Sequence, residues 1–138
     1  MDRDIVLEKL ESLRHCLNRI EDKRPSELKS LQSDVDLQDI ITLNLTRAVQ
    51  LCVDIGAHIL AGGESAPPAT MGETFEKLAE LEVIDSELMT RMKKAVGFRN
   101  IAVHGYGKID YEIVFQIIHK NLADFKHYAQ AIVKATLS

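Results

Sequence analysis

Apolar residues recur every three or four positions along most of the chain, with charged residues between them. The first such stretch predicts an amphipathic helix over residues 4–22, because this spacing places the apolar side chains on one helical face. Pro25 lacks the backbone N–H that a continuing helix needs, and ends it. The apolar set of this helix is Val6, Leu7, Leu10, Leu13, Leu17 and Ile20.

The second and third predicted helices each begin with a residue that can cap a helix N-terminus. Ser33 followed by Asp36 resembles a capping box and opens the second helix, which ends at the glycine pair 62–63. Thr70 with Glu73 forms another such box and opens a short third helix. The polar loop between these two helices is too short to separate domains.

The fourth predicted helix begins after Asp85 and runs to about His104, where the Gly-Tyr-Gly stretch 105–107 breaks it. Asp110 caps a long last helix. Nowhere does the alternation typical of strands persist. The sequence therefore predicts an all-α protein, with residues 1–138 forming a single domain built as a bundle of four to five helices.

The first residues, the lengths of the apolar runs and the cysteines indicate the cellular compartment of the protein. The charged first residues do not resemble a signal peptide, and no apolar run approaches the roughly 20 residues that span a membrane. Cys16 and Cys52 lie in helical patterns and are expected to be reduced core residues. We expect a cytoplasmic protein without a membrane partner.

The charge of the chain is unevenly distributed. Of 138 residues, 17 are basic and 21 acidic, a formal net charge of −4 that alone argues against a nucleic-acid partner. Residues 88–109, however, contain no Asp or Glu. A local excess of positive charge in an acidic protein suggests an anion site, with a phosphate backbone as the obvious candidate. The alternative is that the lysines are solvated near a helix C-terminus. The basic residues of this window are Arg91, Lys93, Lys94, Arg99 and Lys108.

The same window contains polar residues inside an apolar run. Asn100 and His104 are four residues apart and share one helical face. Arg99 lies about 140° from His104 around an ideal helix, so only its long side chain or the end of the helix could bring both to one ligand. Either these residues face a cleft, or Asn100 and His104 form a structural hydrogen-bonded pair with Arg99 at the surface.

The string Arg-Asn-x-x-x-His-Gly-Tyr, residues 99–106, resembles the R-x4-6-H signature of HEPN domains, and more narrowly the R-x4-H-x-Y form of HepT-like toxins. The resemblance extends over essentially the whole chain: its length, its helix order, the motif near the end of the penultimate long helix, and a long final helix. It implies an HEPN-like bundle that acts as a metal-independent endoribonuclease, without cofactor or bound metal.

The resemblance also implies roles for individual residues. His104 would exchange a proton with a ribose 2′-OH or a leaving 5′-oxygen, since imidazole gains and loses protons near neutral pH. Arg99 would hold the phosphate, and Asn100 would orient the phosphate or the imidazole. Arg91, Lys93, Lys94 and Lys108 are candidates for further contacts to RNA phosphates.

Similar proteins imply two partners besides RNA. A homodimer would place two copies of the motif across one interface and supply a second histidine. A minimal nucleotidyltransferase antitoxin would transfer AMP from ATP onto Tyr106 and thereby silence the toxin. The other four histidines, at positions 15, 58, 119 and 127, are interpreted as core-edge or surface residues.

Three other interpretations remain. The chain could be a non-catalytic helical adaptor that binds a protein partner, or an HEPN protein that binds nucleotides without cleaving RNA. A di-iron bundle would need repeated Glu-x-x-His pairs. Only Asp124 and His127 have a comparable spacing, and they occur once.

Overall fold

The computed structural model describes residues 2–64, 66–105 and 108–137, and within these ranges it contains helices and no strand. This confirms the expectation of an all-α protein. The number of helices differs, because a short helix precedes the second predicted one and the last predicted helix is divided. The elements are α1 (Arg3–Lys23), α2 (Leu28–Ser33), α3 (Val35–Ala61), α4 (Met71–Glu80), α5 (Ser86–His104), α6 (Tyr111–Gln116), the π-helical segment η1 (Ile117–Asn121) and α7 (Leu122–Thr136).

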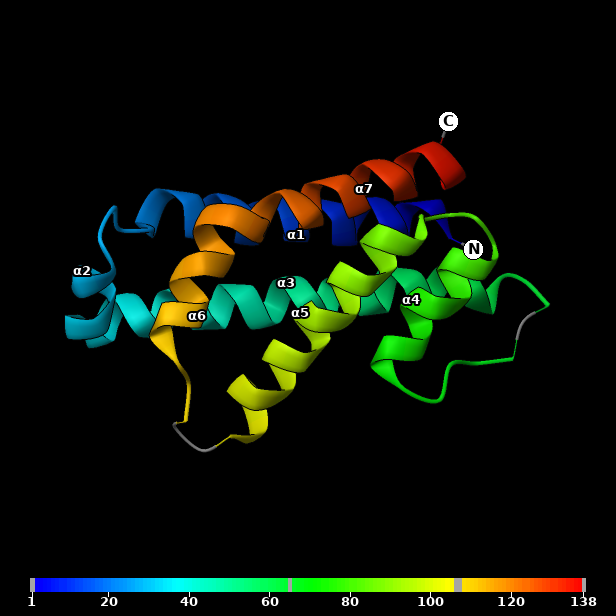
Figure 1. The fold of residues 1–138 in the computed structure, drawn as a ribbon. Coiled ribbons are helices and arrows are strands. Elements are labelled where there is room, and N and C mark those ends of the chain that lie inside the picture. The colour runs from blue at the N-terminus through cyan, green and yellow to red at the C-terminus, as the bar shows by residue number, and fades with distance from the viewer. Residues whose placement is uncertain (1, 65, 106–107, 138) are drawn as a thin grey trace.

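Three long helices, α1, α3 and α7, run along the long axis of the molecule, and α4 and α5 cross them obliquely (Figure 1). The central helix is α3, which contacts α1, α2, α4, α5 and α7. It contributes more buried hydrophobic side chains to the core than any other helix, and each large aliphatic one stabilises the fold by about 1.5–3 kcal/mol. Fully buried examples on α3 are Ile41, Leu45, Ile55 and Leu60.

Side chains of α3, α4 and α7 pack closely around Tyr128. Tyr128 is buried and donates a hydrogen bond to the Cys52 carbonyl oxygen at 2.8 Å. Its ring lies edge-on against Phe75, with centroids 5.5 Å apart. Gly56 makes this approach possible, because a Cβ at that position would lie 2.6 Å from the Thr74 methyl carbon.

Helix α3 is long and apolar enough to cross a membrane by length and composition alone, which the sequence reading did not anticipate. Half of its most apolar window is buried inside the protein. A central core helix has the same length and composition, and α3 packs against helices along its length.

The capping expectations are confirmed at three helices and wrong at one. Thr70, Asp85 and Asp110 each accept a backbone N–H at the start of α4, α5 and α6. Ser33 instead ends α2, and its hydroxyl donates to the Lys29 carbonyl at 2.9 Å. The cap of α3 is the next residue, Asp34, because its carboxylate accepts the Leu37 N–H at 3.1 Å.

The last helix departs from a regular α-helix over η1. A π-helical turn is wider than an α-helical one and shifts the hydrogen bonds of the backbone. Here residues that follow α1 interact with the turn from outside: the Arg24 guanidinium donates to the Ile118 carbonyl at 2.9 Å. A ring nitrogen of His119 lies 2.8 Å from the Pro25 carbonyl oxygen. The segment between α1 and α2 therefore supports the π-helical turn.

Both cysteines are free and buried, as expected from the sequence. Burial raises the pKa of the Cys16 and Cys52 thiols and of the Tyr128 phenol, because the protein interior disfavours their charged forms. In the unfolded chain these groups ionise at their ordinary values, about 8.5 for Cys and about 10 for Tyr.

We predict that the protein loses stability in alkaline solution. Because the folded-state pKa values of the two thiols and the phenol are raised, the contribution of these groups to the free energy of unfolding is complete below about pH 8.5 and declines as pH rises. The decline is at most about 1.4 kcal/mol per pH unit for each group. Urea denaturation at a series of pH values should show this decline. In Cys52→Ala the decline between about pH 8.5 and 10 should be shallower. An unchanged slope in that variant would show that the buried thiol is not its source.

Candidate functional site

The end of α5 places the motif residues. The helix begins at the Asp85 cap and ends at His104, the last helical residue. Gly105 then donates its N–H to the Ile101 carbonyl at 2.7 Å. A Cβ at position 105 would lie 2.3 Å from that carbonyl oxygen, so only glycine permits this ending. The His104 side chain is consequently exposed at the end of the helix.

Arg99 and His104 project from different sides of α5, as the five-residue spacing predicts. Arg99 continues the face of the buried residues Met92 and Val96 and is itself half-buried, whereas Asn100 and His104 are exposed. Arg99 Nη1 donates to Asn100 Oδ1 at 3.3 Å. Among the described side chains no hydrogen bond joins Asn100 to His104, so the polar link in the motif runs from Arg99 to Asn100. It brings the guanidinium toward the side of the helix that carries His104.

The remaining cations of the basic window fall into two groups. Arg91 binds Glu87 at 2.6 Å and Asp124 at 3.2 Å, and Lys93 Nζ lies 3.0 Å from a carboxylate oxygen of Glu76. Intramolecular carboxylates therefore already bind two of the predicted phosphate contacts.

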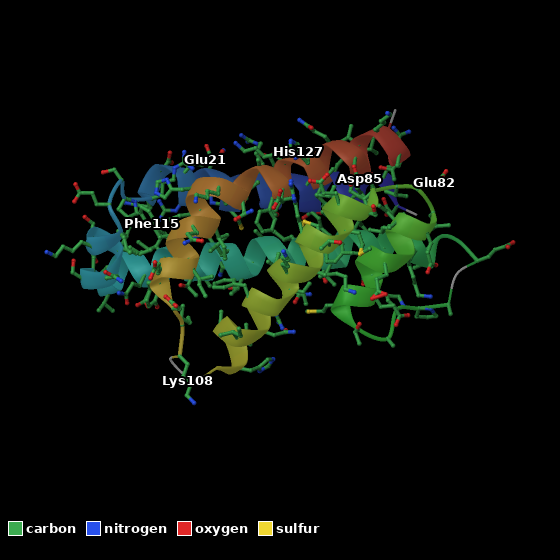
Figure 2. The ribbon with its side chains drawn as sticks, in the orientation of Figure 1. Glu21, Glu82, Asp85, Lys108, Phe115 and His127 are labelled. Atoms are coloured by element: carbon green, nitrogen blue, oxygen red, sulfur yellow. The ribbon has the colours of Figure 1, made fainter. Side chains whose placement is uncertain are left out.

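Lys94 and Lys108 form the second group. Both are exposed, and within residues 2–64, 66–105 and 108–137 neither has an ion pair. Figure 2 shows Lys108 on the connection between α5 and α6, with its side chain extending away from the helices.

A pocket of about 600 Å³ opens beside the motif. Its walls come from α3, α5, α6, η1, α7 and the connection that carries Lys108. Most of the lining is apolar, and Lys94 and Lys108 contribute to it, whereas Arg99, Asn100 and His104 do not. Sequence reasoning missed this pocket because it is assembled from segments distant in the chain.

Residues 13–132 match the family Ribonuclease HepT-like. The chain belongs to the HepT-like ribonuclease family. This confirms the resemblance drawn from the Arg99–His104 motif, and membership makes the protein an endoribonuclease. Among curated relatives, the mRNA nuclease HepT of Shewanella oneidensis is 33% identical over 129 residues, which cover 94% of this chain and 96% of the relative.

Solved structures of HepT-type proteins share the fold. A toxin–antitoxin complex with AMP-PNP contains a chain that superposes with a TM-score of 0.89 at 32% identity, covering 96% of this chain and 99% of the other. A tri-AMPylated Shewanella oneidensis HEPN toxin in complex with an MNT antitoxin also gives a TM-score of 0.89 at 32% identity, covering 97% and 99%. The expected HEPN-like bundle is therefore confirmed.

Tyr106, the expected AMPylation site, lies outside the described residues. Next to it in the chain, the end of this HepT-like protein's α5 carries exposed apolar side chains. Ile101 is 55% exposed and Val103 47%, and Ile113 on α6 is 52% exposed. Clusters of exposed large apolar residues commonly mark surfaces that a partner covers.

No group of three or more His, Cys, Asp or Glu side chains suited to a metal ion occurs among the residues that the structure describes. Asp124 and His127, the pair with metal-ligand spacing, have separate surroundings. Asp124 is 8% exposed and binds Arg91 and Asn121, whereas His127 is exposed on α7. Asp124 therefore has a structural role that its sequence spacing did not suggest: it ties α5 to α7.

We predict that the two carboxylates around Arg91 differ in importance. The Asp124 side chain is 11% exposed and that of Glu87 is 73% exposed. Asp124→Ala leaves Arg91 and Asn121 without a buried partner and should lower the free energy of unfolding by about 1–2 kcal/mol. The matched control Glu87→Ala removes a solvated ion pair and should cost less than about 0.5 kcal/mol. Urea denaturation measures both, and equal losses would contradict a special role for Asp124.

Proposed function

We propose that this chain is the toxin of a toxin–antitoxin pair and cleaves RNA without a metal ion, using Arg99 and His104. The observation that carries the proposal is the family match over residues 13–132, which includes an arginine and a histidine at the exposed end of α5. Two similar structures are toxin–antitoxin complexes, and one relative is named as an mRNA nuclease. A cytoplasmic location, where RNA is available, is part of the proposal.

Arg99 is the residue that holds the scissile phosphate. Its guanidinium is always charged and offers several N–H donors in a geometry that suits phosphate oxygens. One of these donors already binds Asn100 Oδ1, which orients the guanidinium while the others remain for the substrate. Asn100 is thus a positioning residue.

His104 moves the protons. As general base, one imidazole takes the proton of the ribose 2′-OH, and O2′ forms a bond to phosphorus. The bond from phosphorus to O5′ breaks, and a protonated imidazole donates a proton to the leaving oxygen. The products are a 2′,3′-cyclic phosphate and a 5′-hydroxyl end, and no oxidant, metal or further reactant is needed.

A homodimer supplies the second imidazole, because one chain offers a single histidine at this site. Val103, on the last turn of α5, is exposed and lies outside the pocket, and it supports an interface close to the motif. In a two-fold dimer the same surface is used by both chains, which brings two copies of the motif to one cleft.

The RNA backbone extends beyond the scissile phosphate. Lys94 and Lys108 are the cations best suited to neighbouring phosphates, since neither has an ion pair within the described part of the chain. Arg91 and Lys93 contribute only if RNA competes with their carboxylate partners.

The antitoxin is a minimal nucleotidyltransferase that attaches AMP to Tyr106. This part of the proposal rests on the AMPylated toxin among the similar structures and on the Gly-Tyr-Gly sequence directly after α5. Each AMP adds a negative phosphodiester close to Arg99 along the chain, where it competes with RNA for the guanidinium.

We predict that Arg99→Ala and His104→Ala each abolish RNA cleavage and growth inhibition, while the helical circular-dichroism signal is unchanged. The matched control is Lys126→Gln on α7, whose ammonium group binds Glu21, and it should cleave at the wild-type rate.

Wild-type activity should persist in excess EDTA, and sedimentation should give twice the 15.5 kDa chain mass. Wild-type cleavage by His104→Ala would refute the mechanism, and full activity of a monomer would refute the shared site. An inert wild-type protein would favour a non-catalytic binding module.

We predict that co-expression with the antitoxin adds AMP units to Tyr106. Intact-mass and peptide measurements should locate the mass increments on that residue. Tyr106→Phe should escape both modification and neutralisation, while its RNA cleavage should persist. A toxin that is silenced without any added mass would show that inhibition depends on binding alone.

A further inference from the structure

The pocket beside α5 is continuous with the face of the helix that carries His104. Gly97 and Ile101 form part of its wall on α5. They are spaced four residues from each other, and Ile101 is three residues from His104, so the three positions lie along one stripe of the helix. The wall of the pocket therefore ends about one helical turn before His104, which itself does not line the pocket.

The interior of the pocket suits a flat, largely apolar group. Its volume of about 600 Å³ falls within the range of small-molecule sites, roughly 300–1,000 Å³. Leu45 and Val49 of α3 and Phe125 of α7 are buried residues of its wall, and Phe98 adds a half-buried aromatic ring. Nucleobases are commonly held by such apolar and aromatic walls.

Polar groups are few and are placed unequally. The carboxylate of Asp110 caps α6 and that of Asp124 binds Arg91, so both acidic groups of the wall are already engaged. Lys94 and Lys108 have no such partner within the described part of the chain. The wall carries the three cations Arg91, Lys94 and Lys108 against the two carboxylates, a formal excess of one positive charge, which favours an anionic ligand.

Hydrogen bonds within the protein support the far wall of the pocket. Ile117 and Asn121 are the first and last residues of η1, and both line the pocket. Arg24 supports η1 by its hydrogen bond to the Ile118 carbonyl. Asn121 donates its amide to Asp124 at 3.4 Å, which directs the side chain and leaves its carbonyl oxygen able to accept from a base.

We propose that this pocket binds one nucleoside monophosphate unit, with the base against the apolar walls and the phosphate near Lys94 and Lys108. The inference deepens the proposed function: the pocket selects the nucleotide that lies beside the scissile bond. The same chemical unit has two sources, a nucleotide of the RNA chain and an AMP unit attached to the toxin.

Position 97 allows the pocket to be blocked without disturbing the fold. A Cβ at Gly97 meets no other atom within 4 Å, so a larger side chain enters open space at the pocket wall. Gly97→Leu should weaken binding of AMP, GMP, CMP or UMP by roughly tenfold or more, about 1.4 kcal/mol, and Gly97→Ala should have a smaller effect. Lys94→Gln should weaken binding by about threefold, and the matched control Lys126→Gln should not.

Binding is measured by nuclear magnetic resonance on the intact His104→Ala protein, which cannot cleave RNA if the proposed mechanism holds. Each nucleoside monophosphate is added in turn, and the methyl resonances of Ile101 and Ile117 are followed. In proteins that retain His104, the second readout is the base preference at the cut, which should change in Gly97→Leu. Circular dichroism confirms that each variant is folded. No binding of any nucleotide, or equal binding by Gly97→Leu and the unblocked protein, would overturn the proposal.

The two proposals fail separately. If the wild-type protein cleaves RNA but nucleotides do not bind the pocket, the pocket proposal is wrong and the ribonuclease stands. If nucleotides bind and Gly97→Leu prevents it, but no RNA is cleaved, the pocket stands and the catalytic proposal is wrong. Comparing unmodified with AMP-modified protein identifies the source of the nucleotide unit. If the attached AMP fills the pocket, the Ile117 methyl signal shifts in the modified protein and added nucleotides no longer bind to it. If the pocket serves a nucleotide of the RNA chain instead, added nucleotides bind to both forms.

Discussion

The site depends on how far α5 is anchored to the core. Met92 and Val96 are buried, and beyond Val96 none of the residues of α5 is buried. Phe98 still packs against the core as a partly buried residue, and the turns that follow carry Arg99 on the side that continues the buried face. Because the first half of α5 is fixed between α3, α4 and α7, its second half projects in a defined direction without being covered.

Although the protein is acidic overall, some of its basic side chains have no ion pair among the described residues. Arg91 and Lys93, near the middle of α5, are bound to carboxylates of α5, α7 and α4. These pairs join elements of the bundle, whereas Lys94 and Lys108 have no ion pair in the described ranges. The cations available to an anion are thus Lys94 in the middle of α5, Arg99 nearer its end and Lys108 on the connection that follows.

The π-helical segment links the connection between α1 and α2 to the pocket. It interrupts the last predicted helix, and irregular turns of this kind are frequent at functional sites. Arg24 and Pro25, which follow α1, contact η1 through the Ile118 carbonyl and the His119 ring. The pocket wall contributed by Ile117 and Asn121 therefore depends on contacts from a segment more than 90 residues earlier in the chain.

The sequence by itself determined the features that depend on neighbours in the chain. Helical periodicity and the caps Thr70 and Asp85 act within one turn, and the spacing of Arg99, Asn100 and His104 sets their angles around α5, so these were predictable. The family followed from the motif together with the helix order. Only the tertiary structure decided the short helix α2, the π-helical turn, the Arg91–Asp124 pair and the pocket. Each of these requires packing or hydrogen bonds between residues far apart in the sequence, and local periodicity holds no information about which distant side chains meet.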